Sequence, residues 1–192
     1  MIEKWSTPEN KYSHENKKLK EHIDEVKSKM REFLDFYQFG EEYCEIADFL
    51  AEYHDYGKLH KNWEIGKKNV GHSHYSYEYL LEKNISFKDE LIDPILKFLI
   101  LKHHSLISRK IGENLGKRKI EVNGKEWFVE IVFDVLTKDK LERSINYFYR
   151  NNKEKLINIV DVFGLFKIAD IFSAEGDIHI KFEEPILSLI HI

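Results

Sequence analysis

The sequence is poor in the residues that cross-link, stiffen or break a chain. Its 192 residues include one cysteine, three prolines and nine glycines. The single cysteine, Cys44, excludes an internal disulfide framework and suits a reducing compartment. So few prolines and glycines leave room for long uninterrupted helices.

The chain also lacks a long apolar run and a strong charge of either sign. No apolar stretch reaches the roughly 18 residues that a membrane span needs, and no signal peptide opens the sequence, so we expect a cytoplasmic protein without a membrane partner. The net charge of −4 gives no global attraction for nucleic acid, and such binding would need a local basic patch. With 42% hydrophobic and 33% charged residues, the composition is typical of one globular domain over residues 1–192.

Apolar residues recur at helical spacing through most of the chain. From Glu15 an apolar stripe predicts a first helix that ends at Gly40, where a left-handed cap is wanted. Further helices are expected from Glu41 to His54, Ser73 to Lys83, Pro94 to His103, Lys138 to Tyr149 and Lys153 to Ala174. Asn123-Gly124, between two β-rich runs, predicts a hairpin over Lys119 to Val132. We therefore expect a mainly α fold, a helical bundle with a small β-hairpin.

Histidines and aspartates gather at the ends of these predicted helices. His54 and Asp55 end the second helix, and such a pair offers a nitrogen and an oxygen ligand to a metal ion, with another carboxylate oxygen to bridge to a second ion. The other candidates are His22 beside the apolar stripe, His72 at the start of the third helix, His103 and His104 at the end of the fourth, and Asp170 in a segment that is apolar nearly all round. A buried carboxylate is costly unless it is paired or bound to metal. Helices of a bundle can aim such side chains at one point in the core.

Each candidate also has a simpler interpretation. These are a satisfied interfacial histidine at His22, a polar helix end at His103 and His104, ordinary first-turn residues at His72 and His74, and an ion pair of Asp170 with Lys167. Their joint occurrence in the order His, His-Asp, His, His-His and Asp favours the metal interpretation.

This order resembles that of the HD-domain metal-dependent phosphohydrolases, over about His14 to Ala174. The finer motifs resemble the HD nuclease of type I CRISPR interference. They are Tyr53-His54-Asp55-Tyr56-Gly57-Lys58 followed by Trp63, His72 with Ser76 four residues on, His103-His104 after an apolar run, and Ala169-Asp170 before small residues. That branch is often fused to a helicase, for which this chain has no room, so the resemblance is to the stand-alone form. Ser105 stands where the branch usually has glycine.

The resemblance implies two divalent metal ions. One would be held by His22, His54, Asp55 and Asp170, and Asp55 would bridge to a second, held also by His72, His103 and His104. His74 competes with His72 as a ligand, and the place of Ser76 favours His72. Imidazole-rich ligation favours Mn, Fe, Co, Ni or Zn over Mg, and the identity stays open. Lys58 would contact the scissile phosphate, its alternative being a solvated surface lysine.

The function implied is that of a metal-dependent nuclease that cleaves DNA, preferring single strands, in CRISPR interference. A helicase on a separate chain and a CRISPR effector complex would be its partners. Cations mixed with aromatics suit single-stranded DNA, although such runs are also typical of solvated faces. The two sets are Lys58, Lys61, Lys67 and Lys68 with Trp63, and Lys117, Arg118 and Lys119 with Trp127. A phosphohydrolase acting on nucleotides or cyclic nucleotides and a non-enzymatic scaffold stay open as alternatives.

Overall fold

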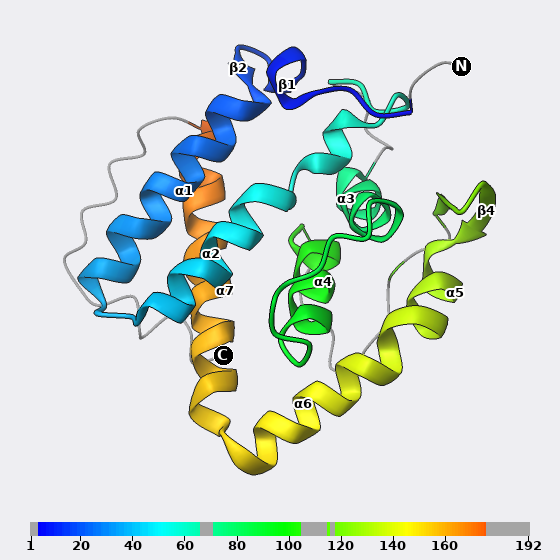
Figure 1. Cartoon of the computed structure of the whole chain (residues 1–192). Coiled ribbons are helices and arrows are strands. Elements are labelled where there is room, and N and C mark those ends of the chain that lie inside the picture. Colours follow the sequence, from blue (N-terminus) through cyan, green and yellow to red (C-terminus); the bar gives the residue numbers. More distant parts are fainter. Residues whose placement is uncertain (1–3, 66–70, 105–114, 116–117, 176–192) are drawn as a thin grey trace.

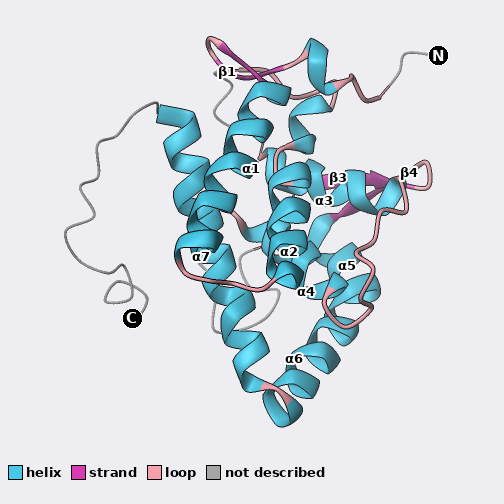
Figure 2. Cartoon of the chain, turned by 60° about the vertical axis from the view of Figure 1, so that its left-hand side comes forward, coloured by secondary structure: helices cyan, strands magenta, loops and turns pink. Residues whose placement is uncertain are grey.

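The computed structural model describes residues 4–65, 71–104, 115 and 118–175. Within them the chain is mainly helical with a small antiparallel β-hairpin, as the sequence predicted (Figure 1). A second short antiparallel pair of strands was not predicted. Three helices lie against one another along one side: α1 (Leu19–Phe36), α2 (Glu41–Tyr53) and α7 (Lys153–Glu175) (Figure 2). None of the helices in these described ranges combines the length and apolarity needed to cross a lipid bilayer.

The other helices complete the bundle around a shared core. They are α3 (His72–Glu82), α4 (Asp93–Lys102) and α6 (Asp139–Asn151). Helix α4 contacts α2, α3 and α6, and α6 leads back to α7 (Figure 1). One apolar cluster draws on all of these helices, with Met30, Leu50, Leu80, Leu99 and Phe166 among its buried members. This common core fixes the helix ends that carry the candidate ligands.

Helix α1 begins four residues later than predicted. The segment before it forms β1 (Tyr12–His14) and β2 (Lys17–Lys18), preceded by the 3₁₀ turn η1 (Pro8–Asn10). The backbone N–H of Leu19 donates to the Lys11 carbonyl, so the chain folds back before the helix starts. The predicted start at Glu15 was wrong because 15–18 holds only polar residues, which do not define a helical face.

The predicted left-handed cap is also misplaced, by two residues. Gln38, with φ of 58°, takes the left-handed position after α1, whereas Gly40 has φ of −70° and is the N-cap of α2. In the last turns of α1, Leu34 is buried in the core, and Phe33 is partly buried against it.

The predicted hairpin is present but shorter than expected. Strands β3 (Lys119–Val122) and β4 (Lys125–Phe128) pair around Asn123 and Gly124, whose φ values of 53° and 74° are those of a type I′ turn. The chain from Val129 is helical: α5 (Val129–Phe133) passes through the π-helix η3 (Asp134–Lys138) into α6. The strand predicted to reach Val132 therefore ends at Phe128.

Candidate metal centre

Three helices bring His22, His54 and Asp170 together in the interior. His22 lies in the second turn of α1, His54 caps the C-terminus of α2, and Asp170 comes from the last turns of α7. The His22 Nε2 atom is 3.2 Å from His54 Nε2 and 3.2 Å from Asp170 Oδ1, and His54 Nε2 is 3.4 Å from the same oxygen. One ligand atom from each residue thus faces a common point.

A second group forms beside the first from the ends of α3 and α4. His72 opens α3, while His103 caps α4 and is followed by His104. The His72 Nε2 atom lies 3.3 Å from His103 Nε2 and 2.7 Å from His104 Nε2. With Asp55, these three imidazoles form a cluster of four potential ligands.

Asp55 lies between the two groups and turns one oxygen toward each. Its Oδ1 atom is 2.8 Å from His72 Nε2, whereas Oδ2 is 3.3 Å from His22 Nε2 and 3.5 Å from His54 Nε2. Oδ2 has no hydrogen bond of good geometry among the described residues, although the Lys58 ammonium is 2.5 Å away. This is the placement that a carboxylate bridging two cations requires.

In His54 and His103, the hydrogen bond made by Nδ1 determines whether Nε2, which faces the centre, carries a proton. His54 Nδ1 lies 2.9 Å from the Ala51 carbonyl and His103 Nδ1 lies 2.7 Å from the Ile100 carbonyl. A carbonyl only accepts, so in the neutral ring the proton is on Nδ1 and Nε2 carries a bare lone pair. Bare lone pairs that converge on carboxylate oxygens repel one another unless a cation lies among them. The donor set therefore fits a divalent metal ion of the type that imidazole and carboxylate bind.

Both aspartates are ionised in this environment. Burial alone would raise the pKa of Asp55, but Lys58 and the surrounding imidazoles hold it well below its usual range. Burial would also raise the pKa of Asp170, but His54 and His22 lower it below its usual range. Two permanent negative charges thus sit where cations would bind.

The pKa of His22 in the first group is shifted in the opposite direction to those of His72 and His103 in the second. Burial lowers the pKa of His72 to about 4, against the attraction of Asp55, and holds that of His103 well below its usual value. Burial also opposes a proton on His22, but the Asp170 and Asp55 carboxylates beside its Nε2 atom raise its pKa. A metal ion would meet free lone pairs on His72 and His103 and would compete with a proton on His22.

The turn after His54 is held tightly against α3. The Gly57 N–H donates to Ser76 Oγ at 2.8 Å, and the Ser76 hydroxyl donates to the His54 carbonyl. A β-carbon at Gly57 would lie 1.8 Å from the His72 carbonyl oxygen, so only glycine allows this approach. The close packing of η2 (Tyr56–Leu59) on α3 places Asp55 within reach of His72.

Lys58 is not the solvated surface lysine of the alternative interpretation. Only 5% of it is exposed, and its ammonium lies between Asp55 and the ring of Trp63, 5.8 Å from the ring centre. The centre therefore has a built-in cation beside its shared carboxylate. Contact of Lys58 with a phosphate stays a prediction.

The competing ligand His74 points away from the cluster. Its Nε2–H donates to the Leu115 carbonyl at 2.6 Å, while His72 faces Asp55. Asp170 likewise forms its described ion pairs with His22 and His54, not with Lys167. All seven predicted ligands are thus brought together, with His104 exposed at the rim.

Two residues near the centre were missed as candidates. His14 on β1 packs edge-to-face on His22, with ring centres 5.0 Å apart. Ser173 lies 2.8 Å from His22 Nδ1. Ser173 follows Asp170 by three residues, and this i+3 spacing was a signal that both side chains share one helix face.

A cavity of about 380 Å³ adjoins the second group. It is lined by Gly71, His72, Ser73, His74, Leu101, Lys102, His104, Leu115 and Arg118. A space of this size beside imidazoles and two cationic side chains can admit a small anionic group.

The proposed stacking surfaces are only partly available. Trp63 is 9% exposed and packs against His72, which leaves little of its ring for stacking on a base. Trp127 is 43% exposed, but the neighbouring Lys119 is paired with Glu126 at 3.1 Å. Lys67, Lys68 and Lys117 lie outside the described residues.

The chain was compared with protein-family models, with curated proteins and with solved structures. None of the three comparisons gives a match.

Proposed function

We propose that this protein is a metal-dependent phosphodiesterase of the HD type, a nuclease that cleaves DNA with a preference for single strands. The observation that carries the proposal is Asp55, whose two oxygens face two separate sets of ligands. The order of the ligands along the chain, resembling that of the HD phosphohydrolases, supports it.

His22, His54 and Asp170 would hold one ion, His72, His103 and His104 the other, and Asp55 would bind both. Two divalent ions would supply Lewis acidity at a phosphodiester and would activate water for attack. Mn, Co, Ni, Fe or Zn suit this imidazole-rich set better than Mg, which prefers oxygen ligands.

The chain's own groups would orient the reactants. His104, exposed at the rim, leaves one side of the centre open to a substrate, whereas the buried His22 and His54 close the opposite side. The Lys58 ammonium, beside Asp55, is placed to meet a phosphate oxygen as a point charge. Burial of the surrounding side chains excludes water and strengthens each of these electrostatic contacts.

The substrate and partners follow from the resemblance to the CRISPR branch. We infer that the protein works in CRISPR interference with a helicase on a separate chain and an effector complex, which would deliver an unwound strand. Trp127, exposed on the β3–β4 hairpin, offers one aromatic surface on which a base could stack.

The direct test is digestion of circular single-stranded DNA by metal-stripped protein reloaded with Mn²⁺, Co²⁺ or Ni²⁺. Cutting of circles requires internal cleavage, and linear single strands, duplex and RNA run in parallel define the preference. Asp55→Asn should lower the rate at least about 100-fold, since it removes the negative charge and leaves an oxygen ligand for only one of the two ions. Asp134→Asn, an exposed aspartate on η3, is the matched control and should cleave like the wild type. Equal cleavage by the wild type and Asp55→Asn would refute the proposal.

The cavity beside His72 and His104 favours a second candidate, a phosphohydrolase of nucleotides or cyclic nucleotides. Its volume is within the range of small-molecule sites. Hydrolysis of a nucleotide panel without cleavage of any DNA would support this function instead. An inert scaffold would bind no stoichiometric metal when purified without chelator.

A further inference from the structure

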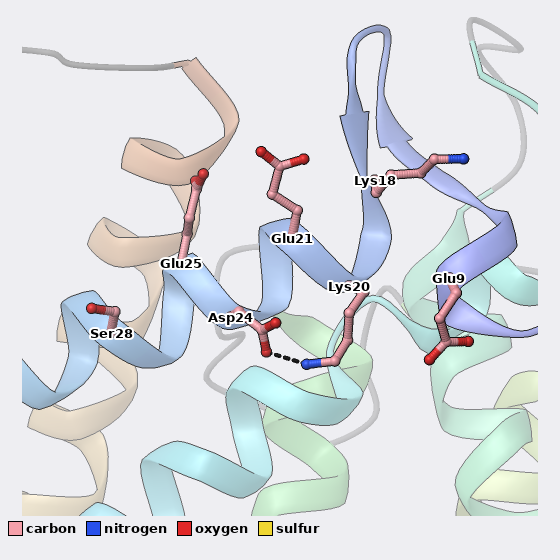
Figure 3. A pocket seen from close by; sticks show the side chains of 7 residues that line it. All are labelled: Glu9, Lys18, Lys20, Glu21, Asp24, Glu25 and Ser28. Atoms are coloured by element: carbon pink, nitrogen blue, oxygen red, sulfur yellow. Dashed lines mark hydrogen bonds and ion pairs between the residues drawn. The ribbon is translucent and has the colours of Figure 1, made fainter.

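A chain of polar groups runs from His22 to the surface between α1 and α7. Ser173, 3% exposed, places its Oγ 2.8 Å from His22 Nδ1 and 2.7 Å from Glu25 Oε2. Lys17 Nζ in turn lies 2.5 Å from Glu25 Oε2 and 2.5 Å from the Ser173 carbonyl oxygen. Figure 3 shows Glu25 on α1, on the rim of a surface pocket, with its carboxylate directed toward α7.

The chemistry of these groups fixes the direction of each hydrogen bond. Burial opposes the charge on Glu25, but hydrogen bonds from Lys17 and Ser173 lower its pKa, so the carboxylate is ionised and only accepts. The Ser173 hydroxyl has one hydrogen, and it donates this to Glu25 Oε2 at 2.7 Å, a nearer and charged acceptor than the His22 carbonyl oxygen at 3.4 Å. Its oxygen therefore accepts the Nδ1–H of His22.

This arrangement leaves His22 Nε2 as the atom that faces the metal centre. Nε2 points to Asp55, Asp170 and His54, and Nδ1 keeps its proton toward Ser173. In His54 and His103 a backbone carbonyl of the same helix accepts the Nδ1–H and fixes the ring. The Nδ1–H of His22 is instead held by side chains that substitution can remove. A carboxylate behind a ligating histidine raises the basicity of the ligand and fixes the ring.

We propose that Ser173 and Glu25 are positioning residues that hold His22 for the ion shared with His54 and Asp170. The inference rests on the proposed metal binding and adds to it a selective effect on one of the two ions. Removing the Ser173 hydroxyl should lower the affinity for that ion about 10–100-fold. The affinity for the ion at His72, His103 and His104 should stay within about twofold of the wild type.

Titration of the metal-stripped protein of residues 1–192 with Co²⁺, followed by calorimetry and by the visible absorption of the bound ion, tests this. The two ions are separated by a His104→Ala background, which should retain the first ion, and an Asp170→Ala background, which should retain the second. Ser173→Ala is expected to weaken binding only in the first background. Glu25→Ala, at an exposed side chain, should act in the same direction without disturbing the core.

Two controls distinguish positioning from general destabilisation. Ser144→Ala removes another buried serine hydroxyl, on α6 away from the centre, and should leave both ions unchanged. Ser173→Thr keeps the hydroxyl and should restore the affinity and the Co²⁺ spectrum, with circular dichroism reporting that each variant is folded.

Each outcome decides between the claims. Wild-type protein that binds no Co²⁺ would overturn both the proposed function and the positioning role of Ser173 and Glu25. If the wild type binds two ions and Ser173→Ala and Glu25→Ala bind them equally well, only the positioning role is overturned. If Ser173→Ala lowers the affinity for both ions equally, Ser173 has a general structural role, and the positioning role is again overturned.

Discussion

Adding one methyl group at Gly57 should separate the two halves of the metal centre. A β-carbon there would lie 1.8 Å from the His72 carbonyl oxygen and 2.6 Å from the Ser76 amide nitrogen. Contacts of a β-carbon under 3.0 Å are essentially never observed, so α3 would have to retreat by at least 1.2 Å, which is 3.0 minus 1.8. His72 is the first residue of that helix and would move with it.

Such a displacement exceeds what metal coordination tolerates. Ligand distances vary by only about 0.2 Å, so Gly57→Ala should lose the ion at His72, His103 and His104 and retain the ion at His22. A misplacement of about 1 Å costs roughly 100-fold in rate. The overlap and the weakened Gly57–Ser76 hydrogen bond should together lower the free energy of unfolding by about 3 kcal/mol.

Metal analysis after Co²⁺ loading and urea denaturation measure both effects. Gly40→Ala is the matched control, because a β-carbon at Gly40 meets nothing within 4 Å and the residue has φ of −70°. It should keep two ions. Two ions of wild-type affinity in Gly57→Ala, with an unchanged urea midpoint, would refute the reasoning.

Three further predictions concern stability away from the ligands. Gly164→Ala, inside α7 with open space at the β-carbon, should raise the free energy of unfolding by up to about 1 kcal/mol in urea, and a decrease would contradict the reasoning. Lys4→Met should lower it by about 3 kcal/mol, because buried Glu78 loses the ammonium 2.6 Å away; Glu78→Gln in the same chain should recover part of this, and strictly additive losses would argue against the pair. Burial and the charge of Lys4 lower the pKa of His60 to about 4, so between pH 6.5 and 4 the unfolded chain binds more protons. The wild type should therefore lose stability relative to His60→Asn as the pH falls through that range, and parallel pH profiles would exclude this role.

Local sequence patterns predicted the helices because each has an apolar face that must be buried. The spacing of Leu19, Ile23, Val26 and Met30 predicted α1, and Asn123-Gly124 predicted the β3–β4 turn. Where no apolar periodicity exists, prediction failed: the polar residues at 15–18 were assigned to a helix, and they include strand β2. The strand predicted to reach Val132 failed for another reason, since β-branched residues also suit a buried helix turn when tertiary packing requires one.

The candidate ligands were predictable from residue type and order, but their geometry was not. Nothing local in the sequence says that Asp55 turns its two oxygens to different partners, because that depends on Gly57 docking against α3. The sequence left Lys58 compatible with solvent or with burial. It also did not define the exposure of Trp63, since a short loop has no periodic pattern that assigns its side chains to the core or to the surface. Long-range packing decided each of these cases.

The position of Asp170 and Ser173 near the end of α7 also matters for protein synthesis. The ribosome delivers this helix after every other ligand, so a growing polypeptide contains all of its candidate imidazoles before it acquires the acidic group that completes the first set. A fragment terminated ahead of α7 would have no such group at that point of the core. Under the proposed nuclease function, nascent or prematurely stopped chains would therefore lack a complete set of ligands for the first ion and would not cleave DNA.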